Sequence, residues 1–198
     1  GMEWTRSLAT FNSAGQPLSE TVDIGDDGTI EHAMAHTYDG NGDEIETIRD
    51  EGNDGTVDLR ISRVFSAPST LSWTGIDHGD DGIHEETRAL TWSGGRVVAE
   101  RLEQQTESGP IQHLMTWQHD SAGNVTVEDL DLGNGGAVDR RTTRQFDAAD
   151  LLIRVDTDDG YDGSIDQVEQ IQRDAAGREL QRTLDIGNDG TIDEELHQ

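Results

Sequence analysis

Apolar and polar residues alternate along much of the chain, in stretches rich in β-branched residues. Clear examples are residues 56–65, TVDLRISRVF, and residues 124–132, NVTVEDLDL. Successive side chains of a strand point to opposite faces of a sheet, so this alternation predicts β-strands. Stripes of apolar residues at helical spacing are scarce. We therefore expect an all-β protein.

A nine-residue acidic motif returns every 27 residues, without insertion or deletion. The seven copies are DIGDDGTIE from Asp23, DEGNDGTVD from Asp50, DHGDDGIHE from Asp77, QQTESGPIQ from Gln104, DLGNGGAVD from Asp131, DDGYDGSID from Asp158 and DIGNDGTID from Asp185. A second motif, exemplified by FNSAGQ from Phe11 and YDGNGD from Tyr38, keeps the same period. Two motifs in one register establish an internal repeat.

The second motif has the composition of a hairpin tip. It sets turn residues, and often a glycine, between two extended stretches, as in a type I turn followed by a left-handed residue and a bulge. Each repeat is then a strand, a tight turn, a second strand and the acidic loop. Residues 1–198 are expected to form a single domain of seven such repeats, and to be a module of a larger protein.

Tandem hairpins predict an antiparallel meander that curls into a barrel, spiral or arc, so that one face is hidden from water. The alternative is a parallel β-helix with one coil per repeat, which requires continuous apolar columns facing inward. One of the better columns is mixed in character: Met34, Ile61, Arg88, Met115, Thr142 and Glu169. Hairpins are therefore favoured. A second column, just before the last acidic residue of the loop, is apolar in six copies and should face inward.

Charge narrows the choice of partners. The chain has 42 acidic and 14 basic residues, a formal net charge of -28, and every basic residue is arginine. Binding to nucleic acid normally needs clustered basic residues, so nucleic acid is an unexpected partner. There is no cysteine, and no apolar run is long enough for a transmembrane segment. No catalytic motif stands out, and the acidic residues recur instead of forming one unique pair, so we expect no enzyme.

The acidic loops have the composition of calcium sites. Calcium takes about six to eight oxygens, and short loops supply them from alternating positions, with a backbone carbonyl at position 7 and glycine at position 6 for the turn. Five loops place carboxylates at positions 1, 5 and 9. The expected ligands, with the carbonyl donor third in each set, are Asp23, Asp27, Thr29 and Glu31; Asp50, Asp54, Thr56 and Asp58; Asp77, Asp81, Ile83 and Glu85; Asp158, Asp162, Ser164 and Asp166; and Asp185, Asp189, Thr191 and Asp193.

Both motifs resemble known repeats. The acidic loop resembles the D-x-D-x-D-G-x-x-D loops of dockerin and thrombospondin type 3 repeats, although position 3 is glycine and an Asn or Asp often stands at position 4. The aromatic-D-x-x-G motif resembles the YD repeat of RHS-type bacterial surface and toxin-shell proteins, which are built from β-hairpins. Their longer consensus is met only in part, as in DAAGRE at 174–179.

Two explanations without calcium stay open. Asp, Asn and Gly are ordinary turn residues, because Asp and Asn side chains accept hydrogen bonds from nearby backbone groups. Plain turns, however, make no obvious demand for an acid at positions 1 and 9. Adaptation to high salt could account for the acidity but not for its period. The loop at 104–112 has lost nearly every ligand and that at 131–139 has lost position 5, so we expect no ion in the first and a weak site in the second.

The leading hypothesis is a calcium-binding structural or adhesion repeat module, with about five Ca²⁺ sites, from a secreted or cell-surface bacterial protein. Its partner would be another protein or a glycan. The alternatives are a segment of an RHS-like shell that encloses a toxin, an acidic-turn scaffold without metal and, with least support, a glycoside hydrolase.

Overall fold

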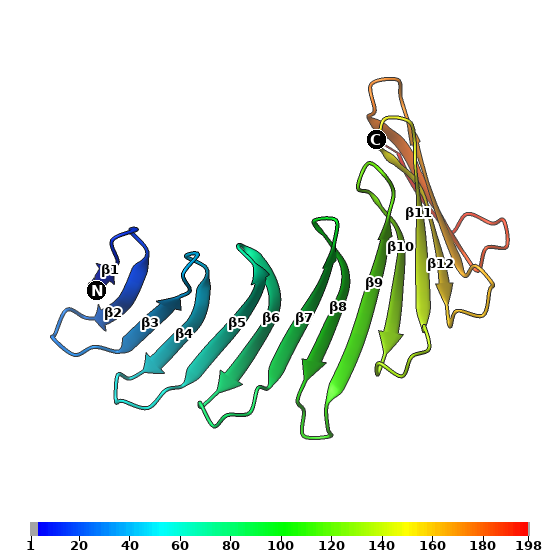
Figure 1. Ribbon diagram of the computed structural model, residues 1–198. Coiled ribbons are helices and arrows are strands. Elements are labelled where there is room, and N and C mark those ends of the chain that lie inside the picture. Colours follow the sequence, from blue (N-terminus) through cyan, green and yellow to red (C-terminus); the bar gives the residue numbers. More distant parts are fainter. Residues whose placement is uncertain (1–3, 198) are drawn as a thin grey trace. The chain divides into compact units, whose positions relative to one another are not determined.

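The protein is a succession of β-strands joined by turns and loops, as a computed structural model describes it for residues 4–197 (Figure 1). The strands are β1 (Thr5–Phe11), β2 (Pro17–Ile24), β3 (His32–Tyr38), β4 (Glu44–Glu51), β5 (Leu59–Ala67), β6 (Thr70–His78), β7 (Glu86–Ser93), β8 (Arg96–Gln104), β9 (Ile111–His119), β10 (Val125–Leu132), β11 (Arg140–Phe146), β12 (Leu152–Asp159), β13 (Gln167–Arg173), β14 (Glu179–Ile186) and β15 (Glu194–His197). Over these residues there is no helix long and apolar enough to cross a membrane.

The strands form an antiparallel meander. Their order in the sheet follows their order along the chain from β1 to β15, and the pairings within β1–β7 and within β9–β15 are antiparallel. A parallel β-helix is excluded, because its coils would pair side by side in the same direction. The expected all-β fold of tandem hairpins is confirmed.

The hairpin tips have the turn that their composition predicts. In β1–β2 the pairing register shifts between Thr10 and Phe11, and Gly15 is left-handed with a φ of 80°. The Asn12 Oδ1 atom accepts the N–H groups of Ala14 and Gln16 at 2.9 and 3.0 Å. A glycine at this place avoids the steric cost of a left-handed backbone. Register shifts recur at the equivalent points of the β3–β4, β11–β12 and β13–β14 hairpins.

The strands fall into two compact units. The first unit extends to Leu90 and includes Leu102–Ile111, and the second comprises Thr91–Arg101 and the chain from Gln112 onward. In each unit, the hairpin tips and the acidic loops occupy opposite ends of the strands (Figure 1). The expectation that residues 1–198 form a single domain stays a prediction.

The apolar core is thin. Among the described residues, Val168 and Ile171 are the buried apolar side chains. The loop column that we expected to face inward is half-buried at several positions, but Ile111 and Ile192 are 46% and 49% exposed. Most of the buried polar residues are instead the first aspartates of the acidic loops: Asp23, Asp77, Asp131, Asp158 and Asp185. Asp77 and Asp23, at 2% and 3% exposed, are more buried than either apolar residue, so the loops contain some of the best protected positions of the fold.

Candidate cation-binding loops

Each acidic loop joins the second strand of one hairpin to the first strand of the next. We number its residues 1 to 9, so that Asp50 and Asp58 are positions 1 and 9 of the loop at 50–58. Positions 3, 4 and 6 are left-handed: Gly52, Asn53 and Gly55 have φ angles of 86°, 48° and 91°. Glycine tolerates this conformation, and Asn and Asp adopt it more readily than other residues. The departures from a calcium-loop consensus at positions 3 and 4 therefore serve the backbone.

The carboxylate at position 1 caps its own loop. Asp77 is 2% exposed, its Oδ1 atom accepts the N–H of Asp81 at 3.1 Å, and its Oδ2 atom accepts the N–H of Gly82 at 3.0 Å. The same pair of bonds occurs in all six loops that start with Asp. The expectation that a turn makes no demand for an acid at position 1 is therefore wrong, because the carboxylate is the acceptor for two N–H groups of the loop backbone.

The carboxylate at position 5 fixes the residue two places on. In the loop at 23–31, the Asp27 Oδ1 atom accepts the N–H of Thr29 at 2.8 Å. This backbone bond, followed by a bond from the Thr29 hydroxyl, holds the pKa of Asp27 below its ordinary value of 3.8. The pKa values of Asp54 and Asp189 are lowered in the same way. Position 5 is exposed in these loops, so its carboxylate also faces solvent.

The carboxylate at position 9 closes the loop onto the strand before it. The Glu31 Oε2 atom accepts the N–H of Ile24 at 2.6 Å, and the Glu31 N–H donates to the Val22 carbonyl at 2.9 Å. Asp58, Asp139, Asp166 and Asp193 make both bonds at the same positions. Position 9, like position 1, thus has a structural use that composition alone does not reveal.

Successive loops are bonded to one another through position 3. The Gly52 N–H donates to the Glu31 carbonyl of the preceding loop at 2.5 Å, and the Gly79 N–H donates to the Asp58 carbonyl at 2.8 Å. In the second unit, the N–H of Gly187 meets the carbonyl of Asp166 at 2.5 Å. The left-handed glycine directs its N–H toward the neighbouring repeat, so position 3 joins repeats and offers no side-chain ligand.

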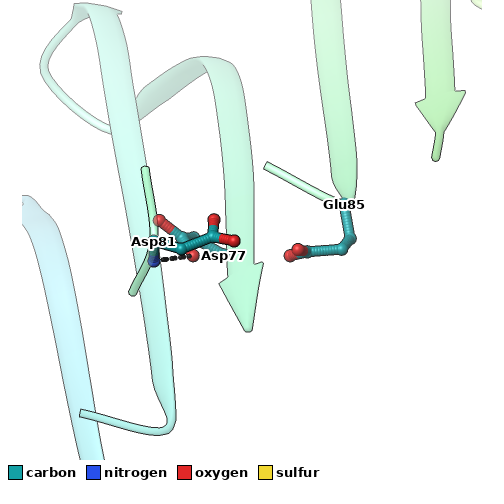
Figure 2. Close-up of side chains that lie close together, drawn as sticks. All are labelled: Asp77, Asp81 and Glu85. Atoms are coloured by element: carbon teal, nitrogen blue, oxygen red, sulfur yellow. Dashed lines mark hydrogen bonds between the residues drawn. The ribbon is translucent and has the colours of Figure 1, made fainter. Parts of the chain in front are cut away.

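One loop brings three carboxylates together. Asp77, Asp81 and Glu85 each offer an oxygen, and the three oxygens lie within 4.8 Å of one another. Figure 2 shows Asp77 and Asp81 close together, with Glu85, the residue just before β7, extending toward them. No other set of three potential ligand side chains in residues 4–197 is as tight. The acids of the other four predicted loops take their expected places around the backbone but stand further apart.

These three carboxylates suit a calcium ion. Calcium–oxygen distances are about 2.3–2.6 Å, so two oxygens on one ion can lie up to about 5 Å apart. A carboxylate has about four acceptor positions, and the backbone bonds of the loop occupy only some of them. A cation can therefore bind to Asp77, Asp81 and Glu85 while the N–H groups stay capped.

The two divergent loops separate backbone structure from charge. At 131–139 the Asp131 carboxylate still accepts the N–H groups of Gly135 and Gly136, although position 5 has no acid. The loop shape is therefore independent of a position-5 carboxylate. At 104–112 the turn is instead closed by paired backbone bonds between Thr106 and Gly109, at 3.0 and 3.3 Å. Each of these loops lacks at least one of the three carboxylates.

Three arginines on the strands lie beside the loops and were not identified from the sequence. Arg6, Arg60 and Arg141 lie on the first strand of their hairpins, opposite the position-1 aspartates Asp23, Asp77 and Asp158. They stand 17 residues before those aspartates in the chain, so only the register of strand pairing brings the two positions together.

The comparisons with known proteins concern the fold. No protein-family model matches the chain, and no curated protein is similar to it in sequence. The crystal structure of TcdB2-TccC3-TEV is 12% identical, with a TM-score of 0.51 over 93% of this chain and 11% of that one. The pore of the Photorhabdus luminescens Tc holotoxin with a TccC3 mutation is also 12% identical, over 91% and 11% of the two chains, with a TM-score of 0.30. A porin-like protein from Bacteroides uniformis is 11% identical over 93% and 88%, with a TM-score of 0.34.

Only the first of these likenesses is close enough to support an argument. It agrees with the hairpin-repeat fold that the resemblance to RHS-type repeats implies, and at 12% identity it shows the fold alone. The chain spans about a tenth of the length of the TcdB2-TccC3-TEV chain that it matches.

Proposed function

We propose that this chain is a structural segment without enzymatic activity, a wall of β-hairpins in a larger secreted or cell-surface protein of RHS-like shell type. The observation that carries the proposal is the bonding of neighbouring repeats at both ends of their strands. At the tips, the Gln16 amide donates to the Gly42 carbonyl at 2.8 Å, and at the loops Gly52 donates to Glu31 at 2.5 Å. Between these two contacts, the strands of neighbouring repeats are paired in the sheet. Such a wall can extend by whole repeats without a change of geometry.

The resemblance of the aromatic-D-x-x-G motif to the YD repeat of RHS-type toxin-shell proteins supports a shell over an isolated spacer or adhesive arm. The hairpin fold shared with TcdB2-TccC3-TEV agrees with this choice. Electron microscopy of the full-length natural protein tests the proposal. We expect the hairpin repeats to continue into a wall around a hollow space. Repeats that project as a free arm, with no enclosed space, would overturn the shell and favour spacing or adhesion.

A second proposal is that the wall binds calcium, beginning with the loop at 77–85. The proximity of Asp77, Asp81 and Glu85 supports it. Ions that bind only the folded chain raise its stability, by roughly 1.4 kcal/mol per site at a tenfold excess over the dissociation constant. Calcium should therefore raise the melting temperature, and magnesium, which demands a tighter octahedral site, should raise it less.

The sharpest variant is Asp81→Asn, which removes one charge while its remaining oxygen can still accept the Ile83 N–H. Asp39→Asn is the matched control, because Asp39 caps a hairpin tip outside the loops through equivalent bonds from Asn41 and Asp43. Calcium content after equilibrium dialysis should fall by about one ion in Asp81→Asn and stay unchanged in Asp39→Asn. A melting temperature that does not move up to millimolar calcium would sink the calcium proposal and leave the wall intact.

A further inference from the structure

The residue opposite position 1 divides the six loops that begin with Asp into two groups. Where it is arginine, the side chain reaches position 4 of the same loop. Arg60 donates from Nε to the Asp80 Oδ1 atom at 2.5 Å, and from a terminal nitrogen to Oδ2 at 3.1 Å. Arg6 lies 4.0 Å from Asp26, and the guanidinium of Arg141 lies 4.6 Å from the centre of the Tyr161 ring. All three of these neighbours occupy position 4. Arg141 also pairs with Asp129 on β10, through two hydrogen bonds of 2.7 Å.

The identity of position 4 follows that of the strand residue. The three arginines face two aspartates and one tyrosine, all of which attract a guanidinium, the tyrosine through its aromatic face. Where the strand residue is apolar, position 4 is asparagine in every case: Ala33 with Asn53, Leu114 with Asn134 and Val168 with Asn188. Asn and Asp adopt the left-handed backbone of position 4 about equally well. Backbone shape alone therefore does not explain the choice between them.

The contacts of Arg60 show how such a pair can act. Its side chain is 28% exposed and that of Asp80 is 30% exposed, so both charges are partly withdrawn from water. The same guanidinium also pairs with Glu46. Arg60 lies in register with Asp77, the buried aspartate that caps the loop. One guanidinium thus connects the strand to a loop that carries several carboxylates.

We infer that Arg6, Arg60 and Arg141 are built-in counter-cations that latch three acidic loops to the sheet. The loops at 23–31, 77–85 and 158–166 are latched, and those at 50–58, 131–139 and 185–193 are open. A latched loop has part of its charge repulsion offset within the protein, so its caps stay closed in the absence of any bound ion. An open loop depends for this on dissolved salt or on a bound cation.

Amide hydrogen exchange in the presence of a chelator tests the latch. The reporters are the N–H groups of Asp81 and Gly82, which donate to Asp77. Because a partly exposed ion pair has a modest strength, Arg60→Ala should speed their exchange by about two- to fivefold. Arg63→Ala is the matched control, since Arg63 lies on the same strand but pairs with Glu44 and Thr47, away from the loop.

Two double variants, each changing both members of a pair, complete the test. Arg60→Ala with Asp80→Asn copies the natural open pair Ala33 and Asn53, and should restore most of the protection lost in Arg60→Ala. Conversely, Ala33→Arg with Asn53→Asp should slow exchange at Asp54 and Gly55, and neither single change should do so. Equal acceleration by Arg60→Ala and Arg63→Ala, or no slowing by the installed pair, would overturn the inference.

Calcium affinity gives a further measurement, which rests on the proposed calcium binding. Removing the guanidinium from beside the Asp77, Asp81 and Glu85 cluster should strengthen calcium binding there severalfold, because like charges repel. If neither the wild type nor Arg60→Ala binds calcium, the calcium proposal fails while the exchange data still decide the latch. If both bind calcium equally and exchange is also unchanged, the latch itself is wrong.

Discussion

Asp27 shows how a single exposed side chain is tied to its loop. Its carboxylate accepts the N–H of Thr29 at 2.8 Å, and that bond and the Thr29 hydroxyl together lower its pKa. A carboxyl group with a lowered pKa stabilises the folded state above its unfolded pKa of about 3.8, and this stabilisation is lost as the pH falls through the folded value. Acidification should therefore loosen this loop.

Thr29→Val tests the share of the hydroxyl. The backbone bond survives, while the side-chain bond is lost, so the pKa of Asp27 should rise toward its ordinary value. Carboxyl-carbon chemical shifts followed by NMR through an acid titration measure this directly. Thr29→Ser keeps a hydroxyl and is the control. Equal pKa values for Asp27 in both variants would show that the hydroxyl has no influence.

Gly75 is required because two aromatic side chains occupy the space that a Cβ atom would fill. A Cβ atom at this position would lie 2.3 Å from His84 Cδ2 and 2.3 Å from the Trp73 ring. These rings pack edge to face, with centroids 5.1 Å apart, on a glycine whose equivalents in other repeats are larger. His84 also replaces the apolar residue found at the same loop position in the other repeats. Trp73, Gly75 and His84 therefore form a packing arrangement that is specific to this repeat.

Gly75→Ala should therefore destabilise the protein by about 1–3 kcal/mol, the usual cost of overpacking. Equilibrium unfolding in urea measures the loss. Gly40→Ala is the control, because a Cβ atom at Gly40 meets nothing within 4 Å and the backbone there is not left-handed. Similar stability in the two alanine variants would mean that Trp73 and His84 move aside without cost.

At the scale of the element, the acidic loop depends on its buried carboxylate more than on its exposed one. Asp158 is 5% exposed and accepts the N–H groups of Asp162 and Gly163. Asp158→Ala removes both bonds, and a hydrogen bond to a charged group contributes about 1.5–3 kcal/mol. Unfolding experiments should show such a loss for Asp158→Ala. Asp162→Ala, at an exposed position, should change stability far less, and the reverse order would contradict this account of the loop.

The hairpin could be predicted from the sequence because its determinants are local. The turn at Asn12 and Gly15 and the alternation of its flanking strands all lie within one repeat. Antiparallel pairing in chain order then follows from short connections. The burial of one face could not be predicted in the same way, because it depends on what packs against the sheet. Ile192, in the expected inward column, is 49% exposed.

The positions of the loops could be predicted from the sequence. The hydrogen bonds inside the loops could not. Spacing placed acids at positions 1, 5 and 9, yet it cannot say which N–H group a carboxylate meets. That is why the capping role of Asp77 was missed. Arg60 was missed because its relation to Asp80 depends on strand register over 20 residues. A comparison of the residues equivalent to Arg60 and Asp80 in each repeat would have shown that the two positions vary together.

At the scale of the whole molecule, the net charge of -28 opposes folding. The Debye length falls from about 30 Å at 0.01 M salt to about 3 Å at 1 M, so salt should screen most of this repulsion. We expect the melting temperature to rise over that range of sodium chloride. Sucrose at equal osmolality is the control for general solvent effects. A melting temperature independent of salt would show that local ion pairs already offset the charge.

The glycine joint between loops bears on how such a chain can change its length. Five loops meet the preceding loop through the N–H of position 3 and the carbonyl of position 9, so these seams, the hydrogen bonds between loops, are interchangeable. The loop at 104–112 differs, because its bond to Glu85 comes from the N–H of Gln105. Loss or duplication of 27 consecutive residues reunites strands whose faces and seams already match, whereas removal of a single residue would turn the side chains beyond it to the opposite face. Recombination between copies of the gene segment can therefore lengthen or shorten the array in whole steps, while individual copies, like that at 104–112, drift in sequence.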